Sequence, residues 1–205
     1  MNTALSCRSV HKRVFACVAA CVISLHAADE KTAKKDPTEE EVKAAMEATS
    51  PGPAHKVLEA FVGEWTLHNK MWMQPGADPM ESEGTASAKW IMGNRYVETT
   101  IKSTMMGQAF EGRAICGYDN LKKTYLGFWI DNMGTSMTLT SGTLSADGKT
   151  LTSKGKMDDA WTGKKDQEYK FVDRFISKDE VNSAIYLVEA GKETKIMEMT
   201  YKRKK

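Results

Sequence analysis

From residue 64 onward, apolar or small side chains recur at every second position in runs of about ten residues. Trp65, Leu67 and Met71 share one side of the first run, and Tyr169 and Phe171 share one side of a later run. A period of two is typical of strands that bury one face, and the runs are separated by Gly, Asn, Asp or Pro, the residues of tight turns. We therefore predict ten strands, over residues 64–74, 81–92, 94–104, 109–118, 123–131, 135–144, 149–157, 166–177, 180–190 and 193–203.

The links between these strands are short. The link around Asp147-Gly148 has a dipeptide that favours a tight hairpin. Links of this length leave no room for a crossover helix, so successive strands must be antiparallel neighbours. A ten-stranded open sheet would expose two long edges, and closure removes them. The pattern predicts a mainly β protein, an antiparallel up-and-down β-barrel of about ten strands.

A single amphipathic helix is predicted just before the first strand. In the segment PAHKVLEAFVG, Val57, Leu58 and Phe61 recur at helical spacing, with Pro53 early and Gly63 just past the end. An apolar helix face needs a surface to cover, so we expect this helix to cap the barrel. Residues 53–205 are then a single β-barrel domain.

The first 27 residues have the order of a secretory signal peptide. Arg8, Lys12 and Arg13 precede the apolar run VFACVAACVISL, and small residues follow. This run is too short to span a bilayer, so we predict cleavage after Ala27 or Ala28, no transmembrane segment, and an exported protein that is periplasmic or secreted. The alternative is a lipid anchor at Cys21, because VAAC resembles a lipobox.

Residues 28–52 are charged and read as a flexible lead-in, within which Thr38 and Glu41 form a possible capping box for a short helix. Without the 3 basic residues of positions 1–27, the chain's 29 Lys and Arg fall to 26, against 27 Asp and Glu. This near-neutral balance, with no basic stripe, argues against a nucleic-acid partner. Cys116 is the one cysteine beyond position 27, so no internal disulfide is expected.

Several motifs carry a resemblance to known families. Gly63-Glu64-Trp65 resembles the G-x-W start of lipocalin-type barrels, in which the Trp packs across the closed end. The segments PGPAHKVLEAFVGEW, MWMQPGADPMESEGTA, FEGRAICGYDN, WIDNMGT and GKTLTSKG, spread over residues 51–203, resemble the bacterial exported family called domain of unknown function 1579 (DUF1579). The resemblance implies a calycin-like barrel of the lipocalin and fatty-acid-binding type, and it implies no activity or catalytic residue.

Two segments leave open which side chains enter the barrel. If Trp129 faces inward, Asp131 shares its face and could orient the polar end of a ligand near the barrel mouth. The alternative is that Asp131 only makes the next turn. Arg95 and Val97 alternate with Tyr96 and Glu98, so either Arg95 or Glu98 could be a polar point in the interior.

Asp119 lies in the segment Tyr118-Asp119-Asn120, which is typical of a hairpin turn because Asp and Asn side chains bond to nearby backbone. The alternative is a catalytic acid, but no base or nucleophile accompanies it.

Methionine is frequent, and two M-x-M pairs stand out: Met71 with Met73, and Met197 with Met199. Thioethers fill irregular cores and line adaptable pockets, and they also suit Cu(I). Haem binding by an inward histidine would require His68, which the alternation places opposite Trp65. No zinc, nucleotide or hydrolase motif is present, so the sequence leaves the identity of any cofactor unknown.

We predict that the barrel interior binds a small apolar or amphipathic molecule. The alternatives are a periplasmic Cu(I)-handling protein that uses methionine pairs, an isomerase-like or cyclase-like barrel enzyme with Tyr96, Glu98 and Asp131 as acid or base, and a filled structural barrel. The candidate ligand-binding residues are Met71, Met73, Trp90, Arg95, Tyr96, Glu98, Phe110, Trp129, Asp131, Met137, Phe171, Met197 and Met199.

Overall fold

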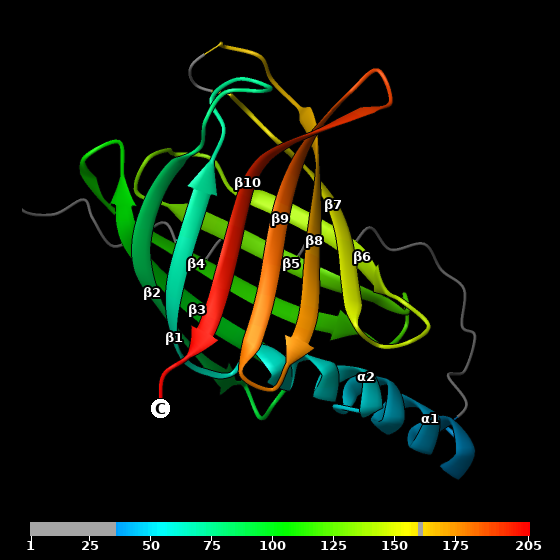
Figure 1. The fold of residues 1–205 in the computed structure, drawn as a ribbon. Coiled ribbons are helices and arrows are strands. Elements are labelled where there is room, and N and C mark those ends of the chain that lie inside the picture. Colours follow the sequence, from blue (N-terminus) through cyan, green and yellow to red (C-terminus); the bar gives the residue numbers. More distant parts are fainter. Residues whose placement is uncertain (1–35, 160–161) are drawn as a thin grey trace, which may run out of the picture. The chain divides into compact units, whose positions relative to one another are not determined.

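The structure is a computed structural model that describes residues 36–159 and 162–205. The predicted signal peptide, the possible lipid anchor at Cys21 and the start of the lead-in lie outside the described residues. Ten antiparallel strands follow one another around a closed barrel (Figure 1). Their bounds are β1 Gly63–Met71, β2 Met80–Ile91, β3 Tyr96–Met105, β4 Gln108–Asp119, β5 Thr124–Asp131, β6 Thr138–Leu144, β7 Thr150–Met157, β8 Gln167–Ser177, β9 Glu180–Glu189 and β10 Lys192–Arg203.

Each strand pairs with its sequence neighbours, and β10 closes the barrel by pairing with β1 from Trp65 opposite Arg203 to Met71 opposite Met197. Each of the ten described strands is therefore paired with a neighbour on both sides. The predicted class and all ten predicted strands are confirmed. The largest differences in bounds are at the end of β1, at residue 71 rather than 74, and at the start of β6, at residue 138 rather than 135.

The helices lie at one end of the barrel, the lower end in Figure 1. The predicted capping helix consists of a short α-helix, α2 (Pro53–Lys56), that tightens into a 3-10 helix, η1 (Val57–Phe61). Such tightening is frequent at helix ends. Leu58 of η1 is fully buried and packs with Val97 and Tyr125 of the barrel. The helix therefore closes this end, as predicted.

Trp65 is part of the closed end and is 2% exposed. Its indole Nε1 donates to the Phe61 carbonyl at 2.8 Å. The Arg203 guanidinium of β10 lies 4.1 Å from the ring centroid, and its Nη1 donates to the Val62 carbonyl at 2.6 Å. One tryptophan thus joins η1, β1 and β10, in the place that the lipocalin-like motif implies.

A second helix, α1 (Glu39–Thr49), precedes α2 and begins with the predicted capping box of Thr38 and Glu41. None of its residues is buried. Its last carbonyls accept hydrogen bonds from barrel side chains: Asn120 Nδ2 donates to Ser50 at 2.8 Å and Arg95 Nη2 donates to Thr49 at 3.0 Å. Polar contacts at its C-terminal end therefore attach α1 to the closed end. Over the described residues, no helix has the length and apolar character needed to cross a membrane.

Candidate functional site

The barrel encloses a cavity of about 850 Å³. This volume lies in the range of small-molecule pockets. Its walls are mostly apolar side chains from the inner faces of the strands, among them Ile101, Phe110, Trp129 and Phe171. The interior of the barrel is therefore not filled by side chains.

The two ends of the cavity differ in composition. Leu58 and Phe61 of η1 form its floor at the closed end. Methionines from the opposite ends of the strands line its mouth: Met71, Met80, Met105, Met106, Met133, Met157 and Met197. Flexible thioethers can adjust to apolar molecules of different shape.

Seven of the predicted ligand-binding residues line this cavity, and they come from β1, β4, β5, β8 and β10. Phe110 and Trp129 stack with their ring centroids 6.3 Å apart and their planes 22° apart. The seven are Met71, Phe110, Trp129, Asp131, Phe171, Met197 and Met199.

The expectation of an interior charge on β3 is wrong. Val97 is 1% exposed and faces inward, so its neighbours Tyr96 and Glu98 face outward. Glu98 forms an ion pair with Lys89 at 3.4 Å, and Tyr96 is 43% exposed. Because neither side chain reaches the cavity, the proposed barrel enzyme loses its acid Glu98 and its Tyr96.

Four other predicted residues also lie away from the cavity. Arg95 lies in the β2–β3 hairpin and donates to the Thr49 carbonyl of α1. Met73 and Met137 are 56% and 69% exposed because they lie beyond the ends of β1 and β6, where strand alternation no longer holds. Trp90 packs against the core of the closed end.

Asp131 faces inward beside Trp129 and also makes the turn after β5, so the two predicted placements are compatible, and its role toward a ligand stays a prediction. Its Oδ2 accepts from the Trp129 indole at 2.8 Å, and its Oδ1 accepts from the Met133 backbone N–H at 2.9 Å. The carboxylate therefore holds the indole and the loop at the mouth, and both oxygens already have protein donors.

Asp119 is a turn residue, as the sequence indicates. Its Oδ1 accepts from the backbone N–H groups of Leu121 and Lys122, each at 2.9 Å. These hydrogen bonds, foremost the one from Lys122, lower the pKa of the carboxyl group below its ordinary value. The Asp119 carboxylate therefore stabilises the turn after β4 by accepting hydrogen bonds from its backbone N–H groups.

Asp173 is the main cavity residue that the sequence reasoning missed. It lies on the inner face of β8, two residues after Phe171, and lines the cavity. The Ser183 hydroxyl of β9 donates to its Oδ1. The period of two that marks Tyr169 and Phe171 as one face also includes Asp173, so the signal was present in the sequence.

The surroundings of Asp173 shift the titration of three groups. Desolvation raises the pKa of Asp173 to about 6, although the hydrogen bond from Ser183 opposes the shift. Desolvation, with a smaller contribution from the Asp173 charge, raises the pKa of the Cys116 thiol to about 12 and raises that of Tyr201. At neutral pH the thiol and phenol are therefore uncharged while Asp173 is mostly ionised. Cys116 is not a thiolate nucleophile here.

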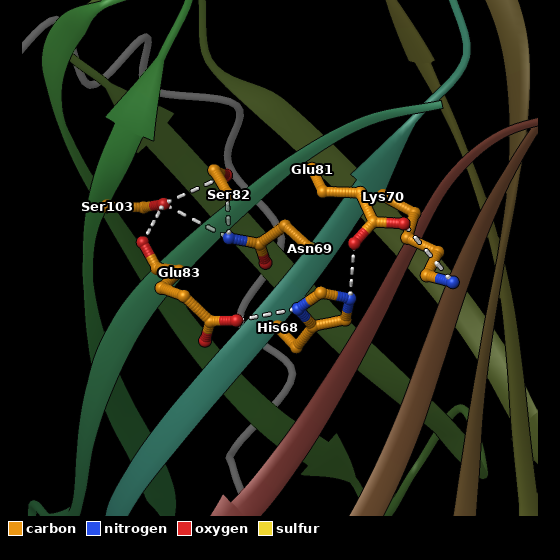
Figure 2. Close-up of polar contacts among 7 residues, drawn as sticks. All are labelled: His68, Asn69, Lys70, Glu81, Ser82, Glu83 and Ser103. Atoms are coloured by element: carbon orange, nitrogen blue, oxygen red, sulfur yellow. Dashed lines mark hydrogen bonds and ion pairs between the residues drawn. The ribbon is translucent and has the colours of Figure 1, made fainter. Parts of the chain in front are cut away.

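A cluster of three neutral polar residues, Asn69, Ser82 and Ser103, lines the cavity nearer the mouth. Asn69 Nδ2 donates to Ser82 Oγ at 3.3 Å and to Ser103 Oγ at 3.0 Å, and Ser103 donates to the Glu83 carbonyl at 2.9 Å (Figure 2). These neutral donors and acceptors join β1, β2 and β3. They give the apolar wall one hydrogen-bonding patch.

His68 lies on the other side of β1 and confirms the predicted outward direction. Its Nδ1 is 2.7 Å from Glu83 and its Nε2 is 3.2 Å from Glu81 (Figure 2). Both ring nitrogens thus face carboxylates outside the barrel, and this histidine cannot bind a group in the interior. The described part of the chain has no group of three or more His, Cys, Asp and Glu residues placed to hold a metal ion.

Several solved structures share the fold, including one from M. tuberculosis and one from Guillardia theta. Rv2717c from M. tuberculosis aligns with a TM-score of 0.56 and 14% identity over 76% of this chain and 100% of that chain. The S-type phycobiliprotein lyase CPES from Guillardia theta aligns with a TM-score of 0.53 and 12% identity over 82% of this chain and 99% of that chain. At such identities the similarity shows the fold alone.

No curated protein has a significant sequence match to the chain. Residues 50–203 match the model of a family described as "Protein of unknown function (DUF1579)". Since these residues are most of the sequence, the chain belongs to the DUF1579 family.

Proposed function

We propose that the barrel binds a small apolar or amphipathic molecule in its interior. The observation that carries this proposal is the cavity of about 850 Å³, with apolar walls and a floor closed by η1. Transfer of apolar ligand surface into it would contribute about 25 cal/mol per Å². Polar groups in the lining, among them Asn69, Ser103 and Asp173, would then orient the ligand.

A cavity-filling substitution tests the proposal against a matched control on the same strand. Ala114 of β4 lines the cavity, whereas Ala109 is exposed on the outer face of β4. We expect Ala114→Phe to weaken the binding of a neutral, environment-sensitive dye such as Nile red by about tenfold or more, because the new ring occupies ligand volume. Ala109→Phe should leave dye binding unchanged. Equal dye binding by the two variants, or no dye binding by the wild type, would contradict interior binding.

Native mass spectrometry of protein purified from its own organism supplies an independent test. A co-purifying organic molecule that Ala114→Phe excludes would support the proposal. A barrel that is empty from its natural source and also fails to take up the dye would overturn it.

A second candidate function is Cu(I) binding at the mouth, and the strand register favours it. Met71 lies opposite Met80 on β2 and opposite Met197 on β10, so three inward thioethers form one row across neighbouring strands. Thioethers suit Cu(I). Met71→Leu should then weaken Cu(I) binding measured against a chromophoric chelator, while Met73→Leu, outside the cavity, should not. Equal behaviour of the two variants would exclude this site.

We also propose export of the protein to the periplasm or the medium. The support is the order of basic, apolar and small residues in positions 1–27. Cell fractionation with the intact mass of the purified chain tests it: a mass beginning after Ala27 or Ala28 supports signal cleavage, and a lipid-modified Cys21 supports the anchored alternative. A full-length chain in the cytoplasm would contradict both.

A further inference from the structure

The described residues that line the cavity include two inward carboxylates and no basic side chain. Asp131 is near the mouth and Asp173 is deeper, whereas Lys, Arg and His are missing from the lining. Glu81 and Glu83 border the cavity too, but their carboxylates point to His68 outside the barrel (Figure 2). A fatty acid would bring a further negative charge to this interior without meeting a cation, which is unfavourable at low dielectric.

Asp173 differs from Asp131 in its free hydrogen-bonding capacity. Both oxygens of Asp131 accept from protein donors. Asp173 Oδ1 accepts from Ser183, and Oδ2 accepts no hydrogen bond from any residue that the structure describes. A carboxylate in an apolar interior is costly unless it is paired, and within residues 36–159 and 162–205 no Lys, Arg or His forms an ion pair with this one.

Aromatic rings surround the same space. Phe110, Trp129, Phe171 and Tyr201 line the cavity with Asp173. The faces of aromatic rings attract cations, and this attraction grows when water is excluded. The walls therefore suit a positively charged group as well as an apolar chain.

We propose that the natural ligand is an apolar molecule with a protonated amine, whose ammonium group pairs with Asp173 while its hydrocarbon part fills the cavity. This inference rests on the proposed interior binding and names the ligand class. An ammonium donates to Oδ2, the oxygen that the protein leaves open, and it neutralises the carboxylate that the fold leaves unpaired. Charge-assisted hydrogen bonds of this kind are about twice as strong as neutral ones.

The test compares three ligands with one hydrocarbon chain and different head groups. Decylamine, decanol and decanoate compete with a bound neutral dye at pH 8, where Asp173 is ionised. We expect decylamine to displace the dye at a concentration about tenfold or more below that of decanol, with decanoate weakest. Decanol or decanoate binding as tightly as decylamine would overturn the amine assignment and leave interior binding intact. Bound dye that none of the three displaces would also overturn the amine assignment. Failure of the wild type to bind any dye would refute interior binding itself.

A matched pair of variants locates the effect. Asp173→Asn removes one negative charge inside the cavity, and Glu98→Gln removes one outside the barrel, where Glu98 pairs with Lys89. Asp173→Asn should reduce the preference for decylamine over decanol to about twofold or less, while Glu98→Gln should keep it. An amine preference that survives in a folded Asp173→Asn variant would overturn the assignment to Asp173.

A pH series on the wild-type chain gives the same answer if Asp173→Asn does not fold. The other titratable groups near Asp173 are Cys116 of β4 and Tyr201 of β10, which stay uncharged because their pKa values are raised. Decylamine stays protonated throughout. Its advantage over decanol should therefore fall about tenfold between pH 8 and pH 5, as Asp173 takes up a proton. A preference that is constant over this range would contradict the proposal.

Discussion

The closed end of the barrel and its mouth have the same strand framework and opposite kinds of interior. At the closed end, Leu58 and Trp65 are 0% and 2% exposed, and aromatic rings meet edge to face, as Phe61 and Phe175 do at 5.3 Å. At the mouth, methionines such as Met80 and Met133 are 44% and 43% exposed and border open space. Close packing stabilises the first region, and adaptable side chains leave room in the second.

This difference indicates that the closed end stabilises the barrel and that the mouth end of the cavity serves binding. At the closed end, the capping helix is fixed to the strands by contacts such as the hydrogen bond from the Tyr125 hydroxyl of β5 to the Ala54 carbonyl of α2, at 3.0 Å. The mouth contributes little packing and leaves the cavity accessible. Changes at the closed end should therefore alter stability, and changes toward the mouth should alter binding.

The largest expected effect is at the closed end. Trp65→Ala should lower the free energy of unfolding by about 3–5 kcal/mol, because it removes a buried ring that joins η1, β1 and β10. Trp129→Ala, at the partly exposed indole near the mouth, should cost clearly less and should weaken dye binding instead. Urea unfolding of both variants measures the contrast, and equal losses would break the division between the two regions.

The next largest effect is a gain in the free energy of unfolding, expected when Asp173 is replaced. Its pKa is raised to about 6 in the folded state from an ordinary value of 3.8, so the folded protein holds its proton more tightly than the unfolded chain does. The contribution of Asp173 to wild-type stability should therefore fall as pH rises from about 4 to 6. Asp173→Asn removes this loss and should raise the free energy of unfolding by roughly 2 kcal/mol at pH 7, with little gain below pH 4.

Urea unfolding of the wild type and Asp173→Asn at pH 4 and pH 7 measures this gain. His55 must be separated from it: desolvation lowers its pKa, so its protonation destabilises the fold as pH falls. This effect is common to both proteins and cancels in their difference. If Asp173→Asn is less stable than the wild type at pH 7, the ionised Asp173 carboxylate stabilises the fold, contrary to this prediction.

A smaller and local effect is expected for α1. Asn120 Nδ2 lies 2.8–3.3 Å from the carbonyls of Glu47, Ala48 and Ser50. Asn120→Ala should speed amide hydrogen exchange in residues 39–49, equivalent to about 1 kcal/mol of local stability, without changing the unfolding of the barrel. Lys122→Ala in the same turn is the control. Unchanged exchange in Asn120→Ala would show that these contacts do not hold the helix.

The smallest effect is expected for Met137, and it tests where the binding site ends at the mouth. Met137 is 69% exposed and lies outside the cavity, whereas Met197 lines it. Met137→Ser should change the free energy of unfolding by less than about 0.5 kcal/mol and leave dye binding unchanged. Met197→Ser should weaken dye binding, because a polar group replaces an apolar wall. A binding loss in Met137→Ser that matches the loss in Met197→Ser would extend the site into the loop.

The strands could be predicted because turn residues and a period of two agree along the chain, and the structure confirms them. It is harder to predict which side chains face the interior where both faces of a strand carry polar and apolar residues. Around Arg95, Tyr96 and Glu98, only the buried Val97 settles which face is inward. Met73 and Met137 lie outside the cavity because β1 ends at Met71 and β6 begins at Thr138. These strand ends depend on backbone pairing that the sequence does not show, so strand alternation does not predict where the two side chains point.

Asp173 could have been found from its place in the alternation, but its importance could not. A charged residue on an inward face is significant only when no cation neutralises it, and that depends on strands distant in sequence. The attachment of α1 by Arg95 and Asn120 is of the same kind. Such contacts join side chains and carbonyls more than 40 residues apart, and local patterns carry no information about them.

The pairing of β1 with β10 also has a consequence for how the chain folds. The Arg203 side chain reaches the Val62 carbonyl 141 positions earlier, so closure requires the two ends of the domain to meet. Long-range pairing of this kind slows folding, because a large loop must lose entropy before the contacts form. During synthesis, β1 and β9 would keep free edges until β10 has left the ribosome. The nascent chain is then most exposed to aggregation just before its last strand arrives.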